Sequence, residues 1–207
     1  VDEFNAINRD LPFAVHIGLV MSRGERMDYA IQKATELGVT SIQLLTSQHG
    51  EVRLKAEQVD KKLAHWQQVA VYACEQCGLN ILPQLLAPMA FAPWLEHQHP
   101  LYPQADVTKL ILAVPNTVAL TDALGADIAK PMSTPNALSR ILTQFQQSSK
   151  PQFLLLIGSE GGFSDQEVIA AIDQGFTAWQ IGDRVLRTET APVVALSSLL
   201  TLYQHLI

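Results

Sequence analysis

The apolar positions of this chain form short uninterrupted runs, separated by segments in which apolar residues recur every three or four positions. Continuous apolar runs are typical of strands buried on both faces, and spacing by three and four is typical of amphipathic helices. The runs predict strands over residues 13–20, 41–46, 81–86, 108–115, 151–158 and 176–182. The helical spacing predicts helices over residues 23–38, 60–78, 91–99, 137–147, 164–175 and 191–207.

This alternation of strands and helices predicts an α/β fold with a mostly parallel sheet flanked by helices. The segments 108–115 and 151–158 are the clearest buried strands, whereas Pro83 places the weaker run 81–86 at a sheet edge. Ser164 and Glu167 form a capping box that starts the helix 164–175. No internal repeat or low-complexity segment interrupts the pattern.

Composition and charge narrow the class of protein. With 207 residues, of which 48% are hydrophobic, the chain can bury one sizeable core. A net charge of −6 argues against a protein that holds nucleic acid over its whole surface, although a local basic patch stays compatible with it. Because no run of eighteen apolar residues occurs and the two cysteines form no disulfide framework, we expect a cytoplasmic protein without a membrane span.

Common catalytic and metal-binding motifs are missing from the sequence. Cys74 and Cys77 form a C-x-x-C pair at the end of a predicted helix, without a second pair to complete a zinc site. Two small residues on one helix face are the expected interpretation, and we predict no metal site. Nucleophile elbows, zincin motifs and phosphate-binding P-loops are also missing.

A glycine-rich stretch, IGSEGGFSDQEV at residues 157–168, joins a predicted strand to a capped helix. In parallel α/β sheets ligands bind outside the carboxyl ends of the strands. Glycines at 158, 161 and 162 let backbone approach a ligand closely, but their spacing is not that of a dinucleotide site. Glu160 disfavours a phosphate here, so a neutral or cationic ligand fits better; a plain strand-to-helix turn is the alternative.

A second polar cluster, GDRVLRTETAP at residues 182–192, also follows a predicted strand. Arg184 and Arg187 lie three positions apart, and Thr188, Glu189 and Thr190 follow them. The arginines suit RNA phosphate or a carboxylate, or Arg187 pairs with Glu189 within the segment itself.

Together, IGSEGGFSDQEV and GDRVLRTETA resemble the ribosomal small-subunit methyltransferase E family. Two further segments, SRGERMDYAIQKATELGV (22–39) and ACEQCGLN (73–80), are similar to the family as well, and the resemblance covers about Ala14 to Ile207. These enzymes are S-adenosylmethionine-dependent methyltransferases of the trefoil-knotted SPOUT superfamily. They form N3-methyluridine in small-subunit (16S) ribosomal RNA.

The resemblance implies a C-terminal deep trefoil knot and a homodimer. It also implies S-adenosylmethionine as cofactor, held by three segments with the residues Ala113, Val114, Pro115, Ile157, Gly158, Glu160, Gly161, Gly162, Ile181, Gly182, Val185, Leu186, Arg187, Thr188 and Ala191. The closing helix carries an apolar stripe that fits a subunit interface or, alternatively, covers the chain's own sheet: Leu196, Leu199, Leu200, Tyr203, Leu206 and Ile207.

The resemblance also suggests roles in catalysis. Arg187 is expected to stabilise negative charge on uracil or to hold the target phosphate, and Glu189 and Glu160 to orient Arg187 or accept the N3 proton. Arg23, Arg26 and Arg184 are expected to contact RNA of the 30S subunit.

The chain departs from the family pattern at Ser159, at Leu79 and at Ser47-Gln48-His49. The lost positive charge affects expected RNA contacts more than cofactor contacts. A catalytically silent RNA-binding or ribosome-assembly protein on the same scaffold is therefore the alternative function. Residues 1–13 are expected to be a linker or the remnant of an N-terminal RNA-binding barrel, and residues 14–207 the methyltransferase domain.

Overall fold

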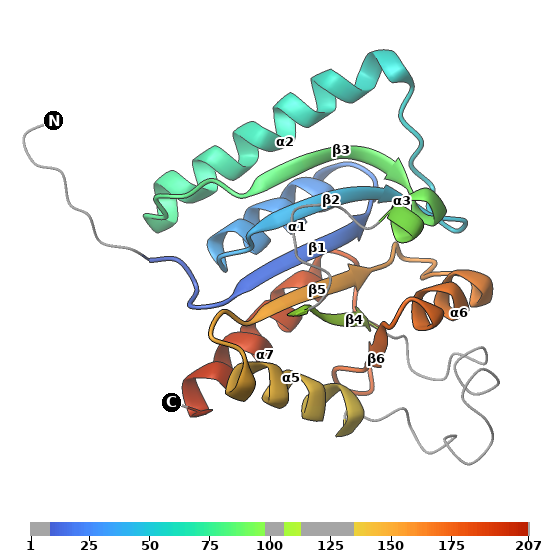
Figure 1. Ribbon diagram of the computed structural model, residues 1–207. Helices are drawn as coiled ribbons and strands as arrows, with labels where there is room; N and C mark the ends of the chain where they lie inside the picture. The colour runs from blue at the N-terminus through green and yellow to red at the C-terminus, as the bar shows by residue number, and fades with distance from the viewer. Residues whose placement is uncertain (1–8, 98–105, 113–134, 207) are drawn as a thin grey trace, which may run out of the picture.

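A six-stranded, entirely parallel sheet forms the centre of the computed structural model, which describes residues 9–97, 106–112 and 135–206 (Figure 1). The strands are β1 (Ala14–Val20), β2 (Ser41–Thr46), β3 (Gln84–Ala90), β4 (Thr108–Leu112), β5 (Gln152–Ile157) and β6 (Thr177–Trp179). The helices are α1 (Glu25–Glu36), α2 (Ala56–Cys77), α3 (Phe91–His97), α5 (Pro135–Gln147), α6 (Asp165–Asp173) and α7 (Thr190–Leu206). The predicted α/β class and parallel sheet are confirmed.

The strand order is β3-β2-β1-β5-β4-β6, so β1 and β5 lie side by side at the centre. Their register runs from Ala14 opposite Gln152 to Leu19 opposite Ile157. Since all six strands are parallel, their carboxyl ends lie at the same end of the sheet.

Side chains of the central strands alternate between two buried layers. Val15, Ile17 and Leu19 of β1 pack into a cluster that also contains residues of α1, α2, α5 and α7. Val20 of β1 and Leu154 and Leu156 of β5 pack into a second cluster, with residues of α3 and α6. Both faces are therefore covered, which explains why these strands have apolar runs rather than alternating polarity. Figure 1 shows α2 beside β3, and α5 and α7 on the β4–β6 side.

Several predicted boundaries need correction, and one of them is the end of the third strand, which lies at Ala90 rather than residue 86. The third strand begins at Gln84 rather than residue 81, because Pro83 lacks an N–H and the ladder begins with the bond from Gln84 N–H to the Thr40 carbonyl oxygen. Its predicted edge position is confirmed. Helix α2 begins at Ala56, four residues before the predicted start. The sixth strand holds only Thr177–Trp179.

The apolar stripe of α7 packs mainly on the chain's own core. Leu196 and Leu199 are fully buried in the first cluster, and Leu200 and Tyr203 pack against it. Leu196 and Leu199 thus cover the chain's own sheet, whereas Leu200 and Tyr203 are only partly buried and Leu206 is exposed; Ile207 lies outside the described residues.

The helices that the structure describes include none both long and apolar enough to cross a membrane.

Candidate functional site

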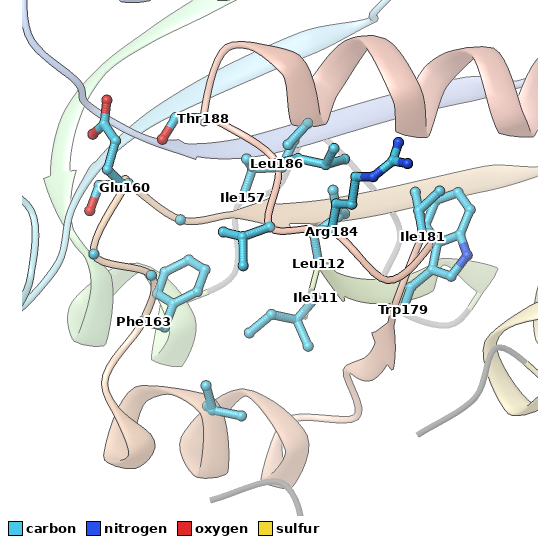
Figure 2. A pocket seen from close by; sticks show the side chains of 17 residues that line it. Ile111, Leu112, Ile157, Glu160, Phe163, Trp179, Ile181, Arg184, Leu186 and Thr188 are labelled. Atoms are coloured by element: carbon cyan, nitrogen blue, oxygen red, sulfur yellow. The ribbon is translucent and has the colours of Figure 1, made fainter. Parts of the chain in front are cut away.

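A cavity of about 270 Å³ lies at the carboxyl ends of β4, β5 and β6 (Figure 2). Its walls are the end of β4, the glycine turn after β5, the loop after β6 and the start of α7. The lining residues are Ile111, Leu112, Ile157, Gly158, Ser159, Glu160, Gly161, Gly162, Phe163, Val168, Trp179, Ile181, Arg184, Val185, Leu186, Thr188 and Ala191. The two stretches singled out in the sequence therefore share one cavity.

The glycine turn after β5 is tight. The Gly162 N–H donates to the Ser159 carbonyl oxygen over 2.8 Å, and Gly162 has φ +67°. A Cβ added at Gly158 would lie 3.2 Å from backbone atoms of Gly162, which cannot move aside without opening the turn. Two of the glycines are thus needed by the turn itself, which leaves its backbone exposed to the cavity.

The turn after β2 supports the glycine turn from outside the cavity. His49 Nδ1–H donates to the Gly161 carbonyl oxygen over 3.1 Å, and the Ser159 hydroxyl donates to the His49 carbonyl oxygen over 3.4 Å. The Gln48 N–H donates to Glu167 Oε1 over 2.8 Å. Three positions where the chain departs from the family pattern therefore meet at the wall of the cavity.

The predicted RNA-binding arginines have different surroundings. Arg26 forms an ion pair with Glu160, which lines the cavity. Arg23 Nε lies 3.0 Å from Glu51 Oε2, and both side chains are exposed. Arg184 is itself one of the lining residues.

Polar groups near the start of α7 are buried but unpaired. Thr188 is 2% exposed, and its hydroxyl has no hydrogen-bond partner. The same holds for Glu189 Oε2, while Glu189 Oε1 lies 3.9 Å from Arg187 Nη1. A buried hydroxyl without a partner costs about 1–3 kcal/mol, so the Thr188 hydroxyl favours a ligand that hydrogen-bonds to it. In Figure 2, Thr188 and Glu160 lie at one end of the cavity, and Trp179 and Ile181 at the other.

Most predicted cofactor residues line the cavity, with five exceptions. Arg187, whose side chain is 74% exposed, and Gly182 are not among the lining residues. Ala113, Val114 and Pro115 lie outside the described residues.

Sequence reasoning missed six lining residues: Ile111, Leu112, Ser159, Phe163, Val168 and Trp179. Five of them are apolar. Ile111, Leu112, Phe163 and Trp179 had as their only signal a position at or beyond a strand's carboxyl end, whereas Val168 lies in α6 and had none. They give the cavity an apolar interior, and its charged and hydroxyl-bearing side chains are Ser159, Glu160, Arg184 and Thr188. This combination suits a flat ring with a polar extension.

In the described part of the chain, no group of three or more His, Cys, Asp or Glu side chains could hold a metal ion. Cys74 and Cys77 lie in the last turn of α2, and neither lines the cavity. Burial raises the pKa of the Cys74 thiol, as for a packed rather than a reactive cysteine.

The parallel sheet with a ligand-sized cavity at its carboxyl edge defines the chain as an α/β ligand-binding domain. Residues 9–200 match the family model of the RNA methyltransferase domain, and the chain belongs to that family.

Individual relatives agree with this assignment. Ribosomal RNA small subunit methyltransferase E of Buchnera aphidicola subsp. Schizaphis graminum is 31% identical over 192 residues, which cover 93% of this chain and 67% of that protein. The crystal structure of the enzyme of that name from Neisseria gonorrhoeae, bound to S-adenosyl methionine, has a TM-score of 0.73 at 31% identity, over 96% of this chain and 70% of that one. A putative methyltransferase of Legionella pneumophila with bound cofactor SAM has a TM-score of 0.71 at 31% identity, over 95% and 69%. The chain thus spans about two thirds of the length of these relatives.

Proposed function

We propose that this chain methylates N3 of a specific uridine in small-subunit ribosomal RNA, with S-adenosylmethionine as methyl donor. The observation that carries the proposal is the cavity built jointly by the turn 158–162 and the loop 181–188. Both segments belong to the matched methyltransferase domain, and two similar structures contain this cofactor in bound form.

The lining residues fit S-adenosylmethionine. Apolar side chains such as Ile157, Trp179 and Leu186 suit the adenine ring, and the Thr188 hydroxyl gains the hydrogen-bond partner that it lacks. The turn 158–162 exposes backbone groups to a polar ligand. The negative charge of Glu160 would disfavour a phosphate ligand. The same charge is compatible with the positive sulfur of a sulfonium. When bound, the cofactor supplies an electrophilic methyl group.

The protein must place uracil N3 in line with that methyl group and exclude water from the cavity. N3 carries a proton at neutral pH, so the reaction also needs stabilisation of the resulting negative charge on the uracil oxygens. We assign this stabilisation to Arg187, which belongs to the loop 181–188. Its guanidinium is exposed and lies 3.9 Å from Glu189 Oε1. Glu189, with one buried unpaired oxygen, holds Arg187 or accepts the proton, and Glu160 is the alternative acceptor.

The proposal extends to the assembly and to RNA. Arg23 and Arg184, which lie outside and inside the cavity respectively, would contact phosphates of the 30S subunit. A homodimer and the trefoil knot are part of the proposal because the resemblance implies them. The nucleotide must also leave its stack to reach the cavity.

Methyl transfer to small ribosomal subunits that lack the modification tests this function. The chain should transfer labelled methyl from S-adenosylmethionine, and mass spectrometry of the digested RNA should place it on N3 of one uridine. Methylcytidine, methylguanosine or 2′-O-methylation as the product would contradict the assignment. RNA binding without calorimetric binding of S-adenosylmethionine would instead support the catalytically silent alternative.

The role of Arg187 is tested by Arg187→Ala. We expect turnover to fall by at least about a hundredfold, as for loss of a group that stabilises transition-state charge, with cofactor affinity unchanged within about tenfold. Arg140→Ala is the control, since exposed Arg140 on α5 donates to the Gly175 carbonyl oxygen and does not line the cavity. Normal turnover of Arg187→Ala would exclude a catalytic role.

A further inference from the structure

An ion pair connects the first turn of α1 with the cavity. Arg26 Nη1 donates to Glu160 Oε1, although the two residues are 134 positions apart in the chain. The sheet order explains the contact, since α1 follows β1 and the glycine turn follows β5, and β1 and β5 are neighbours. Glu160 lines the cavity, whereas Arg26 does not.

Without a partner, the Glu160 side chain would have little to orient it. It stands in a turn with glycines at 158, 161 and 162, and it is 39% exposed. The contacts of the 47–49 turn reach Ser159 and Gly161 but not the Glu160 carboxylate. The contact with Arg26 thus fixes the direction of that carboxylate.

The contact leaves half of the carboxylate available. Arg26 binds Oε1, and an ionised carboxylate has two oxygens that accept several hydrogen bonds or face two cations at once. A carboxylate already held in place loses less conformational freedom when a second cation binds to it. The pair can therefore present Glu160 Oε2 to a positive group in the cavity.

We propose that Arg26 is a positioning residue, which orients Glu160 toward the positive sulfur of S-adenosylmethionine rather than contacting RNA. This inference rests on the proposed cofactor. It accounts for a carboxylate and an arginine that sequence reasoning assigned to separate tasks, and it makes cofactor affinity depend on α1, an element outside the cavity.

Calorimetric titration without RNA tests the positioning role. Arg26→Gln and Glu160→Gln should each weaken S-adenosylmethionine binding by about fivefold, the scale of a half-exposed ion pair. The double variant should bind no more weakly than Glu160→Gln alone, because the two residues act through one contact. Arg26→Lys should restore affinity to within about twofold, since it keeps the charge.

S-adenosylhomocysteine separates positioning from a structural effect, because it has a neutral sulfur. Arg26→Gln should weaken its binding by less than about twofold. Lys33→Gln is the matched control: it removes an ion pair with Glu36 on the same helix, 2.7 Å long and away from the cavity, and should leave both affinities unchanged.

Three results would overturn the inference. One is an equal loss of affinity for the charged and the neutral ligand, and another is additive losses in the double variant. The third is that Arg26→Gln binds S-adenosylmethionine as tightly as the unmodified chain or more tightly. If the same variant binds RNA more weakly, Arg26 contacts RNA, as expected from the sequence. If the unmodified chain gives no heat with S-adenosylmethionine, the proposed cofactor itself is refuted and this inference falls with it.

Discussion

Acidification should destabilise the fold through one buried histidine. His16 in β1 is 5% exposed, and its Nδ1 lies 2.7 Å from the Ser41 hydroxyl oxygen of the neighbouring strand. Burial lowers the pKa of His16 from 6.5 to about 4, because the charged ring would lose its hydration. His16 also borders a cavity of about 420 Å³ at the amino ends of the strands, which Asp10 and Lys150 line as well.

Proton binding determines in which direction the stability of the fold changes with pH. Between pH 6.5 and about 4 the unfolded chain binds a proton at His16 that the folded chain does not bind. The free energy of unfolding is therefore highest above pH 6.5 and decreases as the pH falls through this window. Below about pH 4, His16 causes no further decrease. The pKa difference between the two states corresponds to about 3 kcal/mol of unfolding free energy.

Urea unfolding at a series of pH values from about 7.5 to 4.5 measures this loss. The unmodified chain should lose roughly 2–3 kcal/mol more than His16→Gln over that range, since glutamine does not titrate. His205→Gln at the exposed end of α7 is the control and should follow the unmodified chain. Parallel stability curves for the unmodified chain and His16→Gln would refute the reasoning.

Two further substitutions test a helix cap and the packing of the core. Ser164→Ala removes the hydroxyl that accepts the Glu167 N–H at the start of α6, and thermal unfolding should report a loss of about 1 kcal/mol; an unchanged melting temperature would show that the cap contributes nothing. Gly18→Ala would place a Cβ 3.1 Å from methyl carbons of Leu45 and Leu156 and 3.2 Å from the Trp94 ring, all fully buried, and should cost about 1–3 kcal/mol by urea unfolding. If Gly18→Ala were more stable than the unmodified chain, these side chains would be able to move aside without loss of packing.

The sequence was most informative where burial is complete on both faces. The run FLLLI in β5 has no polar residue, because neighbours on both sides and helices on both faces exclude water from it. The edge strands β3 and β6 were misplaced by several residues, since only one neighbour pairs with each and their polar residues can face solvent.

The candidate site was predicted in part for a related reason. The turn 158–162 and the loop 181–188 each follow a predicted strand and carry a local signal, and the family resemblance assigned them to one site. The structure brings both to one cavity. The contacts of Arg26 with Glu160 and of His49 with Gly161 join segments more than 100 positions apart. They depend on the order β2-β1-β5, for which the sequence has no local signal.

The pairing of β1 with β5 also bears on how the chain acquires its structure. The central ladder joins residues 14–19 to residues 152–157, so β1 lacks one of its two neighbours until residues 152–157 have been synthesised. Ladders between such distant segments have a large loop-closure entropy and form slowly. Until then the apolar edge of β1 is exposed to unwanted pairing, and the cavity lacks the lining residues that the end of β5 and its following turn supply. A protein proposed to act on a ribosomal subunit therefore forms its own site only after β5 and the segments that follow it have been synthesised.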